Sequence, residues 1–480
     1  MHDPAHHPMS GVDTAWLRMD TDVNLMMIVG VWLLEPAITH AALCERIQAR
    51  LLQYPRFREK VVPGLLGAEW VEDTAFDIHR HVLRERLQPR PGQSAREALQ
   101  ARMGELASTP LDPAHPLWCF HLVESYEGGS ASICRIHHCV GDGVALNSVM
   151  MSIADDGPAP PRPDPQAEDA HEHHQGDWLA DELIRPLTGF TVKAIGAYGD
   201  ALVKSLQWLE HPRQTLLGLG DLARGGGRLL ADAAAMALMP DDSRTSLKGH
   251  GNGRKQVAWC EPLPLDQVKA VGKALGASVN DVLIACAGGA IGRYLAEGGE
   301  QLPEQDIRAM VPVNMRPLDQ AWQLGNRFGL VPLLVPVGAI DPLARVARVH
   351  ERMEALKTGY QPLLSYGLLA LSGLLNETAQ KALSALFLDK TTAVMTNVPG
   401  PRQPIRFCGA EVVQSIFWVP ASGDVGVGVS IISYAGGVQF GLITDEVLCP
   451  EPREIIDHFA EEFEQLLWLA LMLPWPARIA

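Results

Sequence analysis

The sequence predicts an α/β protein made of two halves, each with a mixed, mostly antiparallel sheet and flanking helices. Three observations support this fold class. The chain has 480 residues, more than one hydrophobic core usually supports. Apolar stretches of strand length alternate with stretches of helical apolar spacing along both halves. Between the halves, residues 155–175 change abruptly to Pro, Asp, Glu and His and lose all apolar periodicity, which is typical of a linker.

This division predicts three regions. We expect an N-terminal domain at residues 1–155, a linker with bridging helices at 156–250 and a C-terminal domain at 251–480. Helical apolar spacing at residues 178–239 predicts the bridging helices. Their apolar faces fit either packing between the domains, which is the simpler reading, or contact with a lipid surface.

The first half begins with a strand. Residues 25–34 are too continuously apolar for an exposed strand, so a buried central strand is expected. Thr39 is the expected N-cap of an amphipathic helix. Residues 118–125 and 130–137 flank a turn and predict a hairpin, and residues 146–153 have helical apolar spacing. A further helix is expected at 95–107.

The second half shows the same alternation. Ser278 and Asp281 have the spacing of a capping box at the start of an apolar helix. Residues 309–315 and 328–337 read as strands. The remaining expected elements are a strand at 257–260, helices at 265–274, 341–357 and 363–386, strands at 391–398, 416–419, 425–434 and 438–444, and an amphipathic helix at 451–473. The tail at 466–476 is apolar enough to predict a membrane contact.

One stretch of the first half carries side chains for catalysis. His137 and His138 are adjacent, and Asp142 and Gly143 follow after three residues. Histidine is the side chain whose ordinary pKa suits a general base at neutral pH. Adjacent residues of a strand point to opposite sides, so only one of the two imidazoles faces a given cavity, which argues against a shared metal. The spacing alone does not say which one.

The loop after the histidines has an expected supporting role. Gly141 and Gly143 predict a sharp bend around Asp142. Asp142 is expected to hold the base's loop by accepting hydrogen bonds or by pairing with an arginine, because a freely rotating imidazole loses the benefit of proximity. Arg316, at the end of an expected strand of the second half, is the candidate partner, and a surface arginine is the ordinary alternative.

Asn280 and Asp281 lie at the predicted start of a helix. Free backbone N–H groups and the positive end of the helix dipole could receive a carbonyl oxygen that acquires charge there. The alternative is that both residues only cap the helix.

Composition excludes several classes of function. The net charge of −16 argues against a nucleic-acid partner. Eight cysteines without CxxC spacing and no signal peptide predict reduced thiols and a cytoplasmic protein. The apolar run at 25–34 is shorter than the ~20 residues that span a bilayer. Neither a G-x-S-x-G elbow nor a P-loop occurs.

The HHxxxDG pattern resembles the active-site motif of the CoA-dependent acyltransferase superfamily. Further stretches resemble the bacterial wax ester synthase/diacylglycerol acyltransferase family and together cover nearly the whole chain. These stretches are Met9-Ser10-Gly11-Val12-Asp13, Pro116-Leu117-Trp118, residues 257–281 with Asn280-Asp281, Asn397-Val398-Pro399-Gly400-Pro401 and residues 433–445. One departure is Lys248, where the family pattern suggests Asn.

The resemblance implies two chloramphenicol-acetyltransferase-like domains joined by a helical linker, with a tunnel between them. It implies that His138 is the general base at the middle of that tunnel and that His137, Asp142, Gly143 and Asn280 belong to the catalytic site. Trp118, Asp281, Gly329 and Leu330 become candidate substrate-binding residues, although a tryptophan at position 118 is more often part of a core.

The implied reaction moves a fatty acyl group from acyl-CoA to a long-chain alcohol, giving a wax ester, or to diacylglycerol, giving triacylglycerol. No covalent acyl-enzyme, cofactor or metal is expected, since acyl-CoA is a co-substrate, and the partners are lipids and a membrane or lipid-droplet surface contacted peripherally. Two alternatives stay open. One is a condensation enzyme fed by a carrier protein, and the other is a non-catalytic lipid-binding protein.

Overall fold

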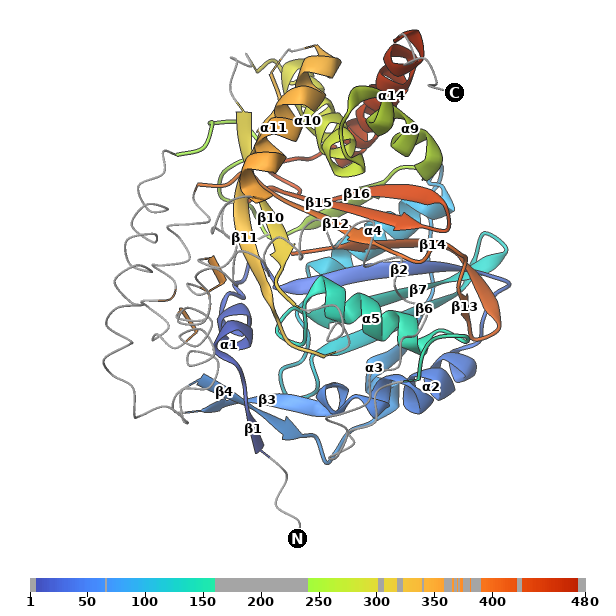
Figure 1. The fold of residues 1–480 in the computed structure, drawn as a ribbon. Coiled ribbons are helices and arrows are strands. Elements are labelled where there is room, and N and C mark those ends of the chain that lie inside the picture. The colour runs from blue at the N-terminus through green and yellow to red at the C-terminus, as the bar shows by residue number, and fades with distance from the viewer. Residues whose placement is uncertain are drawn as a thin grey trace, which may run out of the picture.

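The computed structural model describes most of both halves of the chain. Described are residues 6–64, 67–159, 241–300, 306–316, 323–338, 341–357, 365–366, 369, 372–373, 380, 390–420 and 425–473. The predicted bridging helices at 178–239 and most of the predicted helix at 363–386 lie outside the described residues. The architecture is mixed α/β, as predicted (Figure 1).

The first large sheet has six strands in the order β13-β14-β2-β7-β6-β5. Neighbours run antiparallel except β5 and β6, which are parallel. The strands are β2 (Met27–Glu35), β5 (Val82–Glu85), β6 (Trp118–Tyr126), β7 (Gly129–His137), β13 (Arg406–Phe407) and β14 (Ala410–Trp418). β2 is a buried central strand and β6 and β7 form a hairpin, both as the sequence predicts.

The second large sheet follows the order β11-β10-β12-β15-β16-β8, with β9 also paired to β16. Parallel pairing occurs between β10 and β12 and between β12 and β15, and the other pairs are antiparallel. The strands are β8 (Lys255–Trp259), β9 (Leu263–Pro264), β10 (Asp306–Asn314), β11 (Phe328–Pro336), β12 (Ala393–Pro399), β15 (Val427–Tyr434) and β16 (Gly437–Asp445).

The two sheets do not divide cleanly at the predicted domain boundary. β13 and β14 come from the C-terminal half, yet β14 pairs antiparallel with β2 and completes the first sheet. β2 would otherwise present a bare edge, and an unpaired edge recruits another strand. Sequence periodicity predicts a strand at 416–419 but does not predict its partner. The boundary near residue 250 therefore separates two parts of the chain, but each part contributes strands to the first sheet.

Helices cover both sheets (Figure 1). α9 (Leu265–Leu275), α10 (Val279–Glu297), α11 (Pro342–Lys357) and α14 (Pro452–Met472) lie over the outer face of the second sheet, and their apolar side chains fill its core. α2 (His40–Ala49), α3 (Ile78–His81) and α5 (Gly143–Ile153) belong to the first half. Thr39 caps α2, and Ser278 and Asp281 form the predicted capping box of α10.

The remaining small elements of the first half come from residues 6–72. α1 (Gly11–Arg18) follows β1 (His6–Pro8), which joins a three-stranded sheet with β3 (Glu59–Gly64) and β4 (Gly67–Glu72). Two 3-10 turns, Leu51–Gln53 and Pro55–Phe57, connect α2 to β3. Ser10 caps α1 by accepting a hydrogen bond from the backbone N–H of Asp13.

The helix α4 (Ala95–Ala107) fills the space between the two large sheets. Its Leu99 and Met103 share an apolar cluster with Val29 of β2, Trp259 of β8 and Trp418 of β14. A Cβ at Gly104 would collide with the backbone carbonyl of Lys255, so only glycine lets α4 approach β8 this closely. The two halves therefore share a core.

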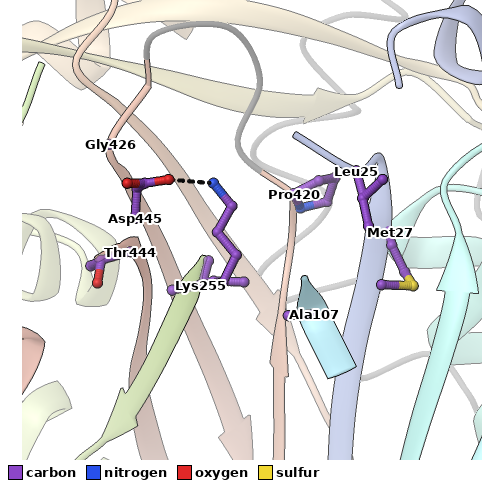
Figure 2. Close-up of a pocket in the computed structure, with 9 residues that line it drawn as sticks. Leu25, Met27, Ala107, Lys255, Pro420, Gly426, Thr444 and Asp445 are labelled. Atoms are coloured by element: carbon purple, nitrogen blue, oxygen red, sulfur yellow. Dashed lines mark hydrogen bonds and ion pairs between the residues drawn. The ribbon is translucent and has the colours of Figure 1, made fainter. Parts of the chain in front are cut away.

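A small pocket opens at the same junction (Figure 2). Leu25 and Met27 line one side, and Lys255 and Asp445 line the other. The Lys255 ammonium lies 3.4 Å from the Asp445 carboxylate and donates a 2.9 Å hydrogen bond to Asn24 Oδ1. The cation is thus already paired within the protein.

Among the described helices, no single one is long and apolar enough to cross a membrane. One pair, α9 and α10, meets the criteria of length and composition together but is bent by 96°.

Candidate active site

The loop that follows β7 crosses from the first half to the second. His138 N donates to Met26 O (2.7 Å), which extends the β2–β7 pairing by one residue. Asp142 N then donates to Gly325 O (3.3 Å) and Gly325 N donates to Val140 O (3.1 Å), so the loop is bonded directly to the segment before β11. The HHxxxDG motif lies at the junction of the two halves.

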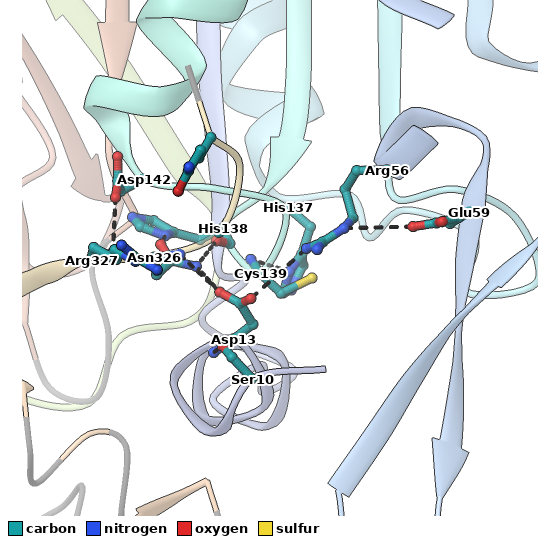
Figure 3. Close-up of polar contacts among 12 residues, drawn as sticks. Ser10, Asp13, Arg56, Glu59, His137, His138, Cys139, Asp142, Asn326 and Arg327 are labelled. Atoms are coloured by element: carbon teal, nitrogen blue, oxygen red, sulfur yellow. Dashed lines mark hydrogen bonds and ion pairs between the residues drawn. The ribbon is translucent and has the colours of Figure 1, made fainter. Parts of the chain in front are cut away.

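Asp142 holds this junction together with its carboxylate, which Figure 3 shows beside Arg327. Its Oδ1 accepts from the backbone N–H of Ala145 at 2.9 Å and so caps α5. Its Oδ2 accepts from Arg316 Nη2 and from the backbone N–H of Arg327, both at 2.9 Å. The predicted ion pair between Asp142 and Arg316 is present, and Arg316 is only 1% exposed.

Arg316 also binds the backbone that faces the loop. It donates to the carbonyl of Gly325 (2.6 Å) and to that of Gln323. A buried charge is stable only when it is paired, and removing one partner of a buried ion pair lowers the free energy of unfolding by about 3–5 kcal/mol. Both oxygens of the Asp142 carboxylate are occupied by hydrogen bonds from Arg316 and from the backbone of Ala145 and Arg327. Asp142 is therefore a positioning group.

The glycines of the motif do not take the strained conformation that a sharp bend would need. Neither Gly141 nor Gly143 has a positive φ, and Gly143 is simply the first residue of α5. The strained glycine is Gly325 across the junction, with φ of 102°. The Asp13 carboxylate would lie 3.4 Å from a Cβ there, which is an ordinary contact, so the positive φ and not a lack of space favours glycine. The chain therefore passes from β7 into α5 at the Asp142 cap without a left-handed backbone at either glycine of the motif.

His138 is held in one tautomer by Asn326. The amide oxygen of Asn326 lies 2.9 Å from His138 Nδ1, while its Nδ2 donates to His138 O and to Asp13 Oδ1, both at 2.8 Å. Two acceptors thus fix the orientation of the amide, so its oxygen must accept a proton carried on Nδ1. No hydrogen bond among the described residues involves Nε2, which is left as the basic nitrogen.

Asp13 anchors Asn326 from α1. Its Oδ1 accepts from the backbone N–H of Asn326 (3.0 Å) as well as from the amide, and Arg56 lies 3.8 Å from its Oδ2. Figure 3 shows Asp13 reaching from α1 toward Asn326 and His138. Burial raises the pKa of Asp13, and Arg56 and Asn326 act against that rise.

Aromatic rings enclose the imidazole of His138. Trp16 stacks on it with ring centroids 4.3 Å apart and 14° between the planes, and the Phe328 ring lies 5.5 Å away. Burial in this apolar site lowers the pKa of His138 from its ordinary value to about 4. The imidazole is therefore neutral at pH 7, which is the form that accepts a proton.

His137 has a separate set of partners. Its Nδ1 accepts from the backbone N–H of Cys139 at 3.1 Å, and its Nε2 lies 3.3 Å from the Asp20 carboxylate. With both ring nitrogens facing the protein, His137 shapes the turn after β7. The geometry thus favours His138 as the base, a choice that strand alternation alone leaves open.

Asn280 and Asp281 differ in role although they are neighbours. Asp281 makes the capping box with Ser278 and pairs with His350 of α11 at 2.8 Å, so it ties two helices together. Asn280 takes no part in the cap, and its Oδ1 accepts from the Asn397 side chain. No hydrogen bond among the described residues involves the Asn280 Nδ2, and the next residue after Asn397, Val398, is the nearest neighbour of a Cβ built at Gly143.

The remaining predicted substrate-binding residues fall in two places. Gly329 and Leu330 directly follow Phe328 on β11, and Leu330 packs against the first core. Trp118 is 1% exposed, donates to Phe57 O (2.9 Å) and stacks on His81, which places it in that core and gives it no described contact with His138.

Sequence reasoning assigned no role to Asp13, Trp16, Asn326 or Phe328. Asp13 closes the MSGVD segment and Asn326 stands in a Gly-Asn-Arg triplet, but neither segment reads as catalytic by spacing. The contact between residues 13 and 326 exists only in the folded chain.

Comparisons with known proteins identify the family. The family model "Wax ester synthase/diacylglycerol acyltransferase catalytic domain" matches residues 9–283, and the "WS/DGAT C-terminal domain" matches residues 324–467. A probable diacylglycerol O-acyltransferase of Mycobacterium tuberculosis is 27% identical over 448 residues, 91% of this chain and 90% of that protein. The O-acyltransferase WSD of Acinetobacter baylyi is 26% identical over 471 residues, 95% and 96% of the two chains.

Two solved structures have the same fold. The wax ester synthase/diacylglycerol acyltransferase from Marinobacter aquaeolei matches with a TM-score of 0.65 at 21% identity, covering 97% of this chain and all of that one. The first condensation domain of the CDA synthetase matches with a TM-score of 0.56 at 16% identity, over 98% and 97% of the two chains. By its family models, which together span both sheets and the junction that holds His138, the chain belongs to the wax ester synthase/diacylglycerol acyltransferase family of O-acyltransferases.

Proposed function

We propose that this enzyme transfers a fatty acyl group directly from acyl-CoA to the hydroxyl of a long-chain alcohol or diacylglycerol, without an acyl-enzyme. The observation that carries the proposal is the state of His138. Its ring is neutral, its Nδ1 proton is engaged by Asn326, and its Nε2 is the nitrogen left to accept a proton.

The chemistry follows from that one nitrogen. Nε2 removes the proton of the acceptor hydroxyl while the oxygen attacks the thioester carbonyl carbon. The tetrahedral oxyanion then collapses, the C–S bond breaks, and the imidazolium returns the proton to the leaving CoA thiolate. General-base help of this kind is worth roughly 10²- to 10⁴-fold in rate.

Asn280 is our candidate for the oxyanion. Asn397 donates to its oxygen, its Nδ2 has no hydrogen bond among the described residues, and the cap of α10 is made by Ser278 and Asp281 without it. A donor at the oxyanion is worth about 10²- to 10³-fold in kcat. The helix N-terminus beneath Asn280 adds a positive field in the same place.

Replacement of the base tests the mechanism. His138→Ala is expected to lower ester formation at least 100-fold while the protein remains folded, with His121→Ala as a buried histidine control outside the junction. Ester synthesis by His138→Ala at the rate of the unmodified enzyme would remove His138 from the mechanism.

The acyl donor separates this proposal from a condensation enzyme. Condensation domains share the fold, and one solved relative, a starter condensation domain of rhizomide synthetase, is described in complex with C8-CoA. We expect ester formation from free acyl-CoA and alcohol in the absence of any carrier protein. Product only with carrier-bound acyl groups would support the condensation reading, and no product from either donor would support a lipid-binding protein.

A lipid surface is the proposed location of the reaction. At the end of α14, Trp468 (62% exposed), Leu471 (54%) and Met472 (77%) point into solvent at helical spacing, so they share one face. All eight cysteines are free thiols, which suits the cytoplasmic side of a membrane or lipid droplet. Flotation with phosphatidylcholine vesicles is expected to recover the enzyme, and Trp468→Ser with Leu471→Ser is expected to leave it in the soluble fraction. Equal flotation of the variant would place the contact elsewhere.

A further inference from the structure

A cluster of metal-ligand side chains lies apart from the active site. His40 and Cys44 are one turn apart on α2, and His79 stands on the neighbouring α3. One ligand atom from each of these three residues lies within 4.8 Å of the others. Figure 1 places α2 and α3 next to each other below the first sheet. The sequence analysis expects no metal, and His79 joins the pair on α2 only through the fold.

The spacing suits a small tetrahedral ion. Cys44 Sγ lies 3.8 Å from each ring nitrogen of His40, and the His40 and His79 rings stack at 6.2 Å with 21° between the planes. Zinc bonds of about 2.3 Å to sulfur and 2.0–2.1 Å to nitrogen place those two ligands about 3.5 Å apart at a tetrahedral angle. The ligands are therefore close to metal-binding separation before any ion arrives.

His40 is also fixed as a metal ligand usually is. Its Nε2 donates to the backbone carbonyl of Val82 at 2.8 Å, which leaves the lone pair on Nδ1. Metal-ligating histidines commonly donate their other N–H to a carbonyl in this way, and that bond sets the tautomer and the ring orientation.

The two sides of the cluster differ in exposure. Cys44 is 7% exposed, whereas His79 is on the surface.

A thiolate and two imidazoles suit zinc or cobalt and not magnesium or calcium, and three protein ligands leave a fourth position for water. Burial raises the pKa of the Cys44 thiol, with Arg84 acting against the rise and Glu45 adding to it. Binding must therefore release the thiol proton to solvent.

We propose that His40, Cys44 and His79 form a zinc-class metal site that ties α3 to α2. The ion binds through the Cys44 thiolate and one nitrogen of each imidazole, and one proton leaves for each ion bound. Besides Arg84 and Glu45, two carboxylates contact the backbone of the proposed ligands: Glu124 accepts from the backbone N–H of His40, and Asp77 accepts from that of His79.

Cobalt is the most direct probe, because a cysteine ligand gives a thiolate-to-cobalt charge-transfer band that histidine-only binding cannot give. Full-length, metal-free enzyme titrated with Co²⁺ at pH 7.5 is expected to develop this band with one equivalent, and Zn²⁺ is expected to abolish it. Cys44→Ser is expected to lose the band, and the exposed His79→Ala is expected to bind at least about tenfold more weakly.

Two variants serve as matched controls. Cys408→Ser removes a thiol that also contacts α2, through Ala42 O, but that lies outside the cluster, and His7→Ala removes an exposed histidine. Both are expected to keep the band and the affinity. Absence of the band in the unmodified protein, its persistence in Cys44→Ser, or unchanged affinity in His79→Ala would each overturn the proposal.

Discussion

Asn326→Ala isolates the group that sets the tautomer of His138. The substitution removes the 2.9 Å contact to Nδ1 and the two hydrogen bonds that Nδ2 donates to His138 O and Asp13. In the transition state the ring becomes charged, and a hydrogen bond to a charged group is worth about 1.5–3 kcal/mol. Since each 1.36 kcal/mol is tenfold in rate, kcat is expected to fall about 10- to 100-fold.

The assay is release of free CoA thiol from acyl-CoA in the presence of a long-chain alcohol, measured as kcat and KM separately. KM is expected to stay close to that of the unmodified enzyme, because Asn326 acts through the base and not on the acyl chain. Asn252→Ala is the matched control. It removes an asparagine that accepts from Arg254 N at 2.9 Å, on the Asp445 side of the junction. A kcat for Asn326→Ala within twofold of the control would refute the role given to Asn326.

Further predictions follow from the same geometry. Asp142→Ala should lower the free energy of unfolding by about 3–5 kcal/mol in urea titrations, because it leaves a buried arginine unpaired; unchanged stability and unchanged activity together would contradict its role. Asn280→Ala should lower kcat about 100-fold or more with stability retained, whereas Asp281→Ala should chiefly lower stability, and the reverse split would exchange their roles. Because the base must be neutral, activity should fall as pH drops toward the lowered pKa of His138, about 4, and Trp16→Ala should move that acidic limb toward pH 6.5 by admitting water. An acidic limb at the same pH in both enzymes would contradict burial as the cause.

Much of the fold was predictable because local sequence patterns indicate many of its helices and strands. The buried strand at 25–34, the hairpin before His137 and the Ser278 capping box all follow from periodicity or capping rules within a few residues. The pairing of β14 with β2 is different in kind, because neither strand carries a local sign of its partner.

The site divides in the same way. The motif pointed to His138 and Asp142, and the end of a predicted strand pointed to Arg316, which does pair with Asp142. The roles of Asn326 and Asp13 could not be predicted from the sequence, because the two residues are 313 positions apart and act through a contact that only the fold creates. An amide between two acceptors and an imidazole can be recognised only when all of them are placed.

The strand exchange between the halves has a consequence for how the protein can be handled. The match to the family's catalytic domain ends at residue 283. A fragment that ends there would lack β14 and would leave the backbone groups along that edge of β2 unpaired. Such a fragment should self-associate through that edge instead of yielding a working half-enzyme. Mixing it with a separately produced C-terminal piece should restore a soluble complex, since the missing strand would then be supplied in trans.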